Sequence, residues 1–317
     1  MIKLQKNVLL KNYSNFKIGG EAQYFLEVFS KNDLIDALKL WQKISKDFSE
    51  NKKRIFVLGG GTNVVFSDGG FDGLVIKNSI DGISKVDGVV TVGAGVMFDD
   101  LLKFSIENAL MGLEWAGGLP GTVGGAVRGN AGAFKGEIKD NVIEVESVDI
   151  ETLEEKVRLS TECEFDYRNS VFKKNNDKEV ITNVKFKLFP SDKYEIQKLI
   201  QEKIDVRNLK HPLEYPNAGS IFKNIPIEKF TSEQMKNLSQ YIKNDPFPLI
   251  PTAKINFLSD LSGKRVGDAQ LSEKHTNYII NLGNAKATDV YKLIQIIKQT
   301  VKEKFNIELE EEVMFVD

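Results

Sequence analysis

Glycine is concentrated in three segments of this chain, and each could bring main-chain N–H groups close to a bound phosphate. The densest segment, residues 117–136, reads GGLPGTVGGAVRGNAGAFKG and holds eight glycines. The other two are the Gly19–Gly20 pair and the run Gly59–Gly61. Because glycine has no side chain, such loops can adopt positive φ and approach a ligand closely. They could hold an extended ligand that carries a pyrophosphate, or they could be tight turns between strands.

Two common phosphate-binding patterns are absent. A dinucleotide-binding unit needs G-x-G-x-x-G after a strand, and a P-loop needs a closing G-K-[ST]. GGGTNV at 59–64 and GAGVMF at 93–98 lack the third spaced glycine, and no lysine and hydroxyl pair follows residues 117–136. The three glycine loops together could still hold a long ligand that carries a pyrophosphate, such as a flavin dinucleotide lying between two subdomains.

Composition excludes several classes of partner and site. The chain has 317 residues, is 41% hydrophobic and 28% charged, and carries a net charge of −2. No basic patch is present for nucleic acid or anionic lipid. No signal peptide or membrane-spanning segment is evident, so we expect a cytoplasmic protein. With Cys163 as the single cysteine and only two histidines, neither a disulfide nor a metal site is expected.

The elements that must position these loops follow from the spacing of apolar residues. Leu34, Ala37, Leu38 and Trp41 recur at helical spacing after Ser30, which predicts a helix over residues 31–48. Further helices are expected at 98–110, 192–210, 231–243, 252–261 and from a capping Thr288 to Phe305. Strands are expected at 55–58, 142–150, 180–188, 278–282 and 307–316, with short strands over 74–95. A β-rich first part and a mixed second part predict an α+β protein of two domains.

Six motifs, in order along nearly the full chain, resemble the UDP-N-acetylenolpyruvoylglucosamine reductase family. They are FKIGG (16–20), LGGGTNVVFSDGGFDGLVI (58–76), GLPGTVGGAVRGNAGAF (118–134), YRNSVFK (167–173), NAGSIFKN (217–224) and FNIELEEEV (305–313). Each motif alone is weak, but six in family order are specific.

The resemblance implies a fold, a reaction and two cofactors. The expected fold is α+β: an FAD-binding region of the vanillyl-alcohol-oxidase type at 1–191, with subdomains 1–77 and 78–191, and a C-terminal substrate domain at 192–317. The family reduces a UDP-N-acetylglucosamine enolpyruvyl ether to UDP-N-acetylmuramate for peptidoglycan, with non-covalent FAD and with NADPH as reductant. The expected partners are thus the UDP-sugar and NADPH, with neither nucleic acid nor membrane, and we expect a monomer.

The resemblance also implies three catalytic residues. Reduction of the enolpyruvyl group needs a hydride, a proton, and stabilisation of the enolate-like charge formed between them. The family's proton donor falls on Ser220, its arginine on Arg168 and its C-terminal glutamate on Glu312. From residue types alone, Ser220 could be a turn serine, Arg168 could pair with Asp166 or Glu164, and Glu312 could lie on a solvated edge.

Cofactor and substrate contacts are carried over from the same motifs. Strand alternation predicts that Glu312 is nearest the apolar end of its acidic run and partly buried. Substrate binding is implied for Lys210 and Asn224, although Lys210 could simply be a helix C-terminal lysine. The expected FAD-binding residues are Gly59, Gly60, Gly61, Thr62, Asn63, Gly121, Thr122, Gly124, Gly125, Asn130 and Gly132.

Two departures from the family pattern and two alternative functions remain. The segment from Arg168 to Lys210 is too short for the loop that bears a substrate-clamping tyrosine in one branch of the family, and FLSDLSG (257–263) lacks a glutamine found in some members. His211, beside Pro212, is expected to be a loop residue, and Arg128 has no assigned role. The alternatives are a flavin-dependent alcohol oxidase and a nucleotide-binding module without activity.

Overall fold

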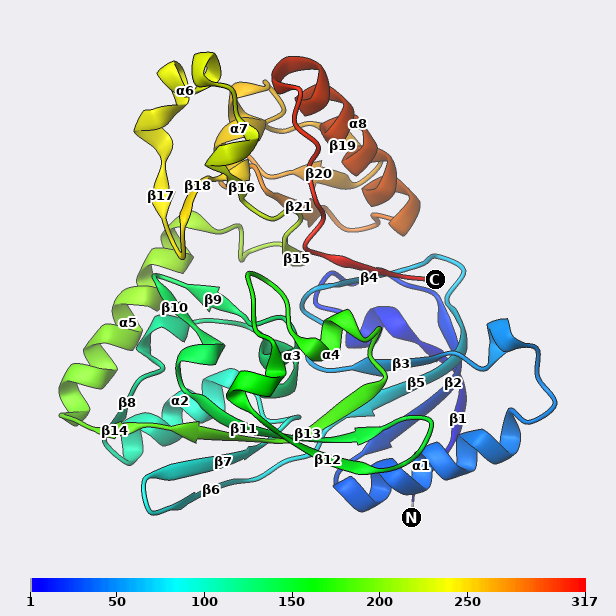
Figure 1. Ribbon diagram of the computed structural model, residues 1–317. Coiled ribbons are helices and arrows are strands. Elements are labelled where there is room, and N and C mark those ends of the chain that lie inside the picture. Colours follow the sequence, from blue (N-terminus) through cyan, green and yellow to red (C-terminus); the bar gives the residue numbers. More distant parts are fainter. Residues whose placement is uncertain (1) are drawn as a thin grey trace. The chain divides into compact units, whose positions relative to one another are not determined.

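The computed structural model describes residues 2–317 and divides into two compact units (Figure 1). Unit 1 comprises Ala22–Gly60, Phe71–Val206 and the described residues before Leu9. Unit 2 comprises Leu9–Glu21, Gly61–Gly70 and Arg207–Asp317. Both units thus draw on separate stretches of the chain. The continuous boundaries expected at residues 77 and 191 stay predictions.

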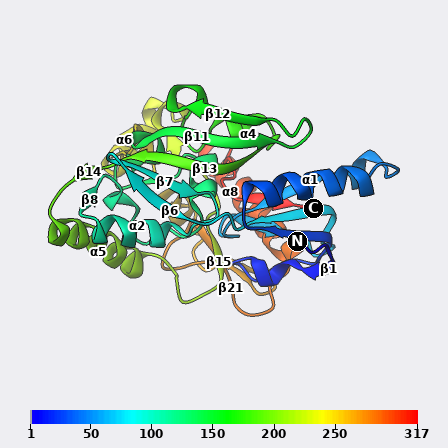
Figure 2. The same ribbon diagram turned by 90° about the horizontal axis from the view of Figure 1, so that it is seen from below.

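The first sheet of unit 1 has the order β1-β2-β5-β3. Its strands are β1 (Gln5–Leu9), β2 (Glu21–Val28), β5 (Phe71–Asn78) and β3 (Ile55–Leu58), and β5 runs parallel to both β2 and β3. Helix α1 (Lys31–Ile44) lies along this sheet (Figure 2), with Leu34, Leu38 and Trp41 buried in the same core as Leu26 and Leu74. The predicted helix is confirmed, and the Ser30 side chain accepts the N–H of Asp33 as its N-cap.

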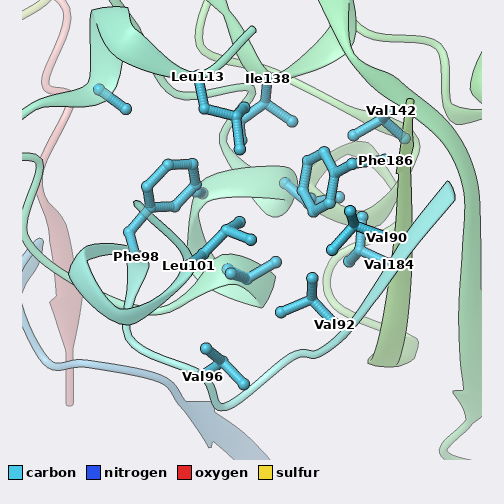
Figure 3. Close-up of a cluster of buried hydrophobic side chains, with 14 of the residues drawn as sticks. Val90, Val92, Val96, Phe98, Leu101, Leu113, Ile138, Val142, Val184 and Phe186 are labelled. Carbon is cyan, nitrogen blue, oxygen red and sulfur yellow. The ribbon is translucent and has the colours of Figure 1, made fainter. Parts of the chain in front are cut away.

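The second sheet of unit 1 is antiparallel and has the order β12-β11-β13-β7-β6. Buried side chains such as Val90, Val184 and Phe186 pack beneath it against Phe98 and Leu101 of α2, as Figure 3 shows. The predicted strands at 142–150 and 180–188 and the helix at 98–110 are therefore confirmed within a few residues. The elements are β6 (Ile83–Val86), β7 (Val89–Gly93), α2 (Phe98–Glu107), β11 (Val142–Asp149), β12 (Glu155–Leu159), β13 (Glu179–Lys187) and α5 (Lys193–Lys210).

The glycine-rich stretch is not a continuous loop. It contains the short helix α3 (Val123–Arg128), whose N-cap is Thr122, and the two-stranded pair β9 (Gly132–Ala133) and β10 (Gly136–Glu137). Gly124 and Gly125 have a low helix propensity, but they do not prevent α3 from forming. The helix is stabilised by packing, because Val123, Ala126 and Val127 are buried. The other short elements of unit 1 are β8 (Leu110–Met111), α4 (Val171–Lys174) and β14 (Phe189–Pro190).

Unit 2 is built on an antiparallel sheet of order β15-β21-β20-β19. Helix α8 (Ala287–Phe305) packs on it through Val290, Leu293, Ile294 and Ile297. The sheet consists of β15 (Asn217–Ser220), β19 (Arg265–Val266), β20 (Ala269–Leu271) and β21 (Tyr278–Asn281). The remaining elements are α6 (Ser232–Leu238), α7 (Thr252–Leu258), β16 (Ile225–Pro226), β17 (Lys243–Asn244), β18 (Pro248–Ile250), β4 (Val64–Phe66) and β22 (Met314–Val316).

Two details of unit 2 differ from the sequence-based expectation. Thr288 lies inside the first turn of α8 and is not its cap; the N–H groups of Ala287 and Thr288 donate to the Asp68 carboxylate at 2.8 and 3.0 Å. The final strand covers only Met314–Val316 and pairs with β4, while Glu311 makes an isolated bridge to Phe222. The alternation predicted over 307–316 therefore breaks before Glu312.

No helix among residues 2–317 is long and apolar enough to cross a membrane. The expected cellular location and the expected monomeric state stay predictions.

Candidate functional site

The glycine loops around Gly59–Gly60 and Gly121–Thr122 of unit 1 are in contact, and they lie too close for a side chain at Gly59 or Gly60. A Cβ atom on Gly60 would lie 2.7 Å from Cα of Gly121, and a Cβ on Gly59 would lie 2.6 Å from Oγ1 of Thr122. Lys77 stabilises the first of these loops, because its Nζ donates to the Gly59 carbonyl at 2.6 Å. Burial lowers the pKa of Lys77. Both loops are glycine-rich for a steric reason that neither shows by itself.

These loops present main-chain donors that the protein does not use. Within residues 2–317, the N–H groups of Gly59, Gly60, Gly121 and Thr122 donate to no protein acceptor. By contrast, the N–H groups at the start of α3 are taken: Val123 donates to Val96, Gly124 to Ala94, and Gly125 to the Thr122 hydroxyl. Unused N–H groups on adjacent glycines form a concave donor set that suits phosphate oxygens. The donor set therefore fits a pyrophosphate-bearing group.

A pocket opens beside these loops in unit 1. Gly59, Thr122, Gly124 and Gly125, four of the predicted cofactor-binding residues, line it. Its other side carries charge, because Arg128 donates through Nε and Nη2 to both carboxylate oxygens of Asp177. Arg128, which had no assigned role, thus forms a bidentate ion pair on the cavity wall. The lining residues are Val57, Gly59, Asn78, Ala94, Thr122, Gly124, Gly125, Arg128, Phe172, Asp177, Glu179, Val180 and Ile181.

The remaining predicted cofactor residues occupy other positions. Asn130 is fully buried, and its amide is used inside the protein: Nδ2 donates to Glu137 and to the Asp166 carbonyl, and Oδ1 accepts the N–H of Lys139. Gly132 lies beside Arg168. Their assignment to cofactor binding stays a prediction.

Gly61, Thr62 and Asn63 belong to unit 2. A Cβ on Gly61 would meet the Tyr13 carbonyl at 1.9 Å, so this glycine also has a steric cause. The Asn63 side chain donates to the Glu312 carbonyl at 3.1 Å, which ties this loop to the end of the chain. Cofactor binding by these three residues likewise stays a prediction.

Arg168 is half-buried in unit 1 and has a left-handed backbone, with φ of 54°. Its Nη2 donates to the Gly132 carbonyl at 2.8 Å, and its guanidinium lies over the Tyr167 ring, 5.0 Å from the centroid. Of its two acidic neighbours in sequence, Glu164 pairs with Lys174, and Asp166 accepts the N–H of Tyr167. The Gly132 carbonyl and the Tyr167 ring therefore hold the guanidinium in one orientation.

Ser220 ends strand β15 on an irregular turn in unit 2. The register of β15 against β21 shifts between Asn217 and Ser220, and Gly219 has φ of 77°. The Asn217 side chain fixes this bulge, because its Oδ1 accepts the N–H of Gly219 at 3.0 Å and its Nδ2 donates to the Tyr215 carbonyl at 2.8 Å. Such a bulge re-aims a side chain out of the strand, as a reacting hydroxyl requires.

Glu312 is joined through its main chain to Ile221, the residue that follows Ser220. Its N–H donates to the carbonyl of Ile221 at 2.8 Å, and its own carbonyl accepts from Asn63. Glu312 is half-buried, as predicted, but so is Glu311, whereas Glu308 and Glu310 are exposed. The predicted reason is wrong, since the strand does not extend through this residue. Two main-chain hydrogen bonds position Glu312 instead.

The two predicted substrate-binding residues differ in how firmly they are held. Lys210 is exposed at the last position of α5. Asn224 is half-buried, and its Oδ1 accepts the N–H of Thr252 at the start of α7. Both belong to unit 2, with Ser220 and Glu312. Substrate contacts from either residue stay a prediction.

Two residues that position Ser220 were not singled out from the sequence. Asn277 pairs its side-chain amide with the backbone of Phe222, accepting its N–H at 3.1 Å and donating to its carbonyl at 2.8 Å. Tyr278 stands directly opposite Ser220 in the β15–β21 pair. In the sequence, Asn277 and Tyr278 are only a polar and an aromatic residue at the start of a predicted strand. Because that pattern is common, it does not single them out as functional.

Comparison with known proteins finds the same family over the whole chain. Residues 211–316 match the family model for the C-terminal domain of UDP-N-acetylenolpyruvoylglucosamine reductase, and residues 36–152 match that for an FAD binding domain. The chain is 36% identical to UDP-N-acetylenolpyruvoylglucosamine reductase of Clostridium novyi (strain NT) over 316 residues, covering 99% of this chain and 92% of that protein. The Staphylococcus aureus (strain COL) reductase is 34% identical, with the same coverage.

A solved structure is similar as well. The crystal structure of UDP-N-acetylenolpyruvylglucosamine reductase from Thermus caldophilus superimposes with a TM-score of 0.77 at 29% identity, and the match covers 100% of both chains. The similarity in sequence and the similarity in fold therefore agree over the full length.

Proposed function

Because the chain belongs to the UDP-N-acetylenolpyruvoylglucosamine reductase family, we propose that it reduces UDP-N-acetylglucosamine enolpyruvate to UDP-N-acetylmuramate, with NADPH as reductant. The protein is a flavin-dependent oxidoreductase, and its cofactor is FAD. The predicted fold, an FAD-binding region of the vanillyl-alcohol-oxidase type followed by a C-terminal α+β domain, is confirmed. The product would serve peptidoglycan synthesis.

The observation that carries this proposal is the set of unused main-chain donors in the glycine loops. Gly59, Gly60, Gly121 and Thr122 offer N–H groups that no protein atom accepts in the described chain, and Gly59 and Thr122 also line a pocket. Those residues would hold the diphosphate of FAD, because backbone donors replace the hydration of phosphate oxygens. When bound, FAD supplies the hydride that the enolpyruvyl group accepts and takes its electrons from NADPH.

Arg168 would bind and polarise the enolpyruvyl carboxylate. Its guanidinium is half-buried, permanently charged and oriented by the Gly132 carbonyl. A fork of N–H donors placed where negative charge develops stabilises that charge without moving at the moment of reaction. In this proposal Arg168 therefore stabilises the enolate-like charge on the substrate.

Ser220 would give its hydroxyl proton to the substrate carbon, and Glu312 would assist from beside it. A serine is a weak acid, so the reaction depends on its placement. The Asn217 and Asn277 hydrogen bonds fix the chain on either side of Ser220. Glu312 is held in the same part of the chain, since its N–H donates to the Ile221 carbonyl.

Separation of the two half-reactions tests the proposal. NADPH should reduce the flavin of the purified protein, and the enolpyruvyl sugar nucleotide should reoxidise it without oxygen. In Ser220→Ala we expect the first rate to be unchanged and the second to fall by about 10²–10⁴-fold, the usual contribution of a general acid. Both rates are read from flavin absorbance.

Ser239→Ala is the matched control, since it removes an exposed serine of the same unit. A protein that acquires no flavin spectrum with added FAD contradicts the proposal. So does a flavin that oxygen reoxidises rapidly while the enolpyruvyl substrate does nothing. Equal loss of both rates in Ser220→Ala would instead assign the serine to folding or flavin placement.

A further inference from the structure

Both histidines of the chain lie against one tyrosine in unit 2. The ring of Tyr278 is 5.1 Å from that of His211 and 4.8 Å from that of His275, and the two histidine rings are 5.3 Å apart. Nδ1 of His211 is hydrogen bonded to the Tyr278 hydroxyl at 3.2 Å. These three residues form the His–Tyr cluster. His211 lies in the loop after α5, as predicted, and its ring packs against Tyr278.

The His–Tyr cluster reaches Ser220 directly. Ser220 and Tyr278 are register partners in the antiparallel β15–β21 pair, so their side chains stand side by side on one face of the sheet. The Ser220 hydroxyl lies close enough to the phenol to act on it, since it lowers the pKa of Tyr278 against the effect of burial. The three side chains thus stand in a row: Ser220 is beside Tyr278, and the Tyr278 hydroxyl is hydrogen bonded to the imidazole of His211.

Burial keeps every group of this path uncharged near neutral pH. Burial lowers the pKa of His211 to about 4, and the neighbouring His275, Arg207, Lys274 and Lys210 act in the same direction. Burial likewise lowers the pKa of His275 to about 4 and raises the pKa of Tyr278, which Glu312 raises further and Arg207 opposes. Tyr278 is 8% exposed, whereas His211 is half-buried. The phenol is thus shielded, whereas His211 and Ser220, on either side of it, are both partly exposed.

We propose that Tyr278 and His211 form the proton relay that returns a proton to Ser220 after each turnover. The inference rests on the proposed role of Ser220 as proton donor. With His211 as the Nδ1–H tautomer and both hydroxyls turned toward the substrate, each group can donate to the next: Nδ1–H to the Tyr278 oxygen, the Tyr278 hydroxyl to Ser220, and Ser220 to the substrate carbon. Tyr278 and His211 act only through Ser220, so they are positioning residues.

The transfer is balanced in protons and charge. As Ser220 gives its proton to carbon, Tyr278 gives one to Oγ of Ser220, Nδ1 of His211 gives one to the phenol oxygen, and Nε2 of His211 takes one from water. No group of the relay keeps a net charge, and the one proton lost from the medium is the proton gained by the product. Before the next turnover His211 returns to the Nδ1–H tautomer by releasing the Nε2 proton to water and taking one at Nδ1, which changes no net charge. Movement in this concerted form suits groups that burial holds neutral.

Tyr278→Phe and His211→Gln test the relay. Phenylalanine keeps the ring packing and removes the hydroxyl, while glutamine keeps a hydrogen bond and cannot accept a proton in this range. In both variants we expect FAD binding, the NADPH half-reaction and the KM for the enolpyruvyl substrate to be unchanged. Flavin reoxidation by that substrate should slow by about 10²-fold. Tyr291→Phe, which removes an exposed phenol on α8, is the matched control.

The pH profile separates a relay from a purely structural role. Without the relay, Ser220 must recover its proton from the medium, so reoxidation in the variants should speed up as pH falls from 8 to 6, while the native rate stays flat. Native reoxidation rates with a flat profile in both variants overturn the relay. So does loss of FAD or of both half-reactions in both variants. If Ser220→Ala itself reoxidises at the native rate, the proposed role of Ser220 fails; if it is slow while Tyr278→Phe is fast, only the relay fails.

Discussion

Glycine is required at different positions of this chain for two different physical reasons, close packing and positive φ. Gly60 has no room for a side chain, because a Cβ would meet Cα of Gly121 at 2.7 Å. Gly219 has open space around it but adopts φ of 77°, which other residues reach only with strain of roughly 1–2 kcal/mol. Gly60 therefore allows two loops to meet, and Gly219 allows the chain to turn before Ser220.

At Gly60, we expect alanine to push the two glycine loops apart and weaken cofactor binding. Overpacking against a main-chain atom costs about 1–3 kcal/mol, which corresponds to roughly a 5- to 150-fold rise in the Kd for FAD. Flavin fluorescence during titration measures the Kd. Gly129→Ala is the control, because its Cβ would find only the Gly125 carbonyl, at an unstrained 3.8 Å. Unchanged FAD affinity in Gly60→Ala would contradict the assignment of these loops to the cofactor.

Helix α8 begins where a segment distant in sequence supplies its cap. The Asp68 carboxylate, in the loop after β4, accepts the N–H groups of Ala287 and Thr288. Two orphan donors of the first turn are thereby satisfied, and a negative charge sits at the positive end of the helix dipole. Thr288 looked like a cap in the sequence because threonine is a preferred cap residue, but Asp68 takes that role from more than two hundred residues away.

The Asp68→Ala variant should lose about 1 kcal/mol of unfolding free energy, the usual cost of removing a cap. Asp68→Asn keeps an acceptor oxygen and should lose less, since only the charge on the dipole is removed. Urea unfolding followed by circular dichroism gives both values. An alanine variant as stable as the native protein would show that the two N–H groups are equally well satisfied by water.

At the scale of the whole molecule, the burial of both histidines couples folding to pH. The folded protein holds His211 and His275 unprotonated down to about pH 4, whereas the unfolded chain protonates them near pH 6.5. Unfolded chains therefore bind more protons below pH 6.5, and the unfolding free energy falls as the pH drops toward 4. Two carboxylates behave in the same sense at lower pH: ion pairing overcomes burial and lowers the pKa of Asp149 to about 2 and that of Glu179 below its usual value.

The urea midpoint should consequently fall between pH 6.5 and 4.5, above the range in which Asp149 contributes. Replacing both histidines by asparagine should make this part of the profile shallower, because the histidines' share of the proton difference between folded and unfolded chains disappears while that of carboxylates such as Glu179 remains. The double variant is compared with the native holoenzyme at pH 7.5, 6.0 and 4.5. Identical slopes for the two proteins would show that the histidines are protonated in the fold.

The sequence by itself determined most of the local elements and the family. The helical spacing of Leu34, Leu38 and Trp41 specified α1, because the stripe of apolar side chains lies on the same helix that buries it. The density of glycine predicted ligand-binding loops at residues 59–61 and 117–136, since the conformational freedom of the main chain depends on residue type. The six motifs in order were enough to predict the family and the fold.

Only the tertiary structure decided which distant groups meet. Neither Gly60 nor Gly121 shows in the sequence that the other lies against it, and nothing near Ser220 predicts Tyr278 or His211. The last strand was predicted too long, because the hydrogen bonds of Glu312 to Ile221 and Asn63 replace the expected alternation. Contacts between remote residues depend on the register of paired strands and on how side chains are buried across the whole core. A local sequence pattern specifies neither the register nor the burial partner.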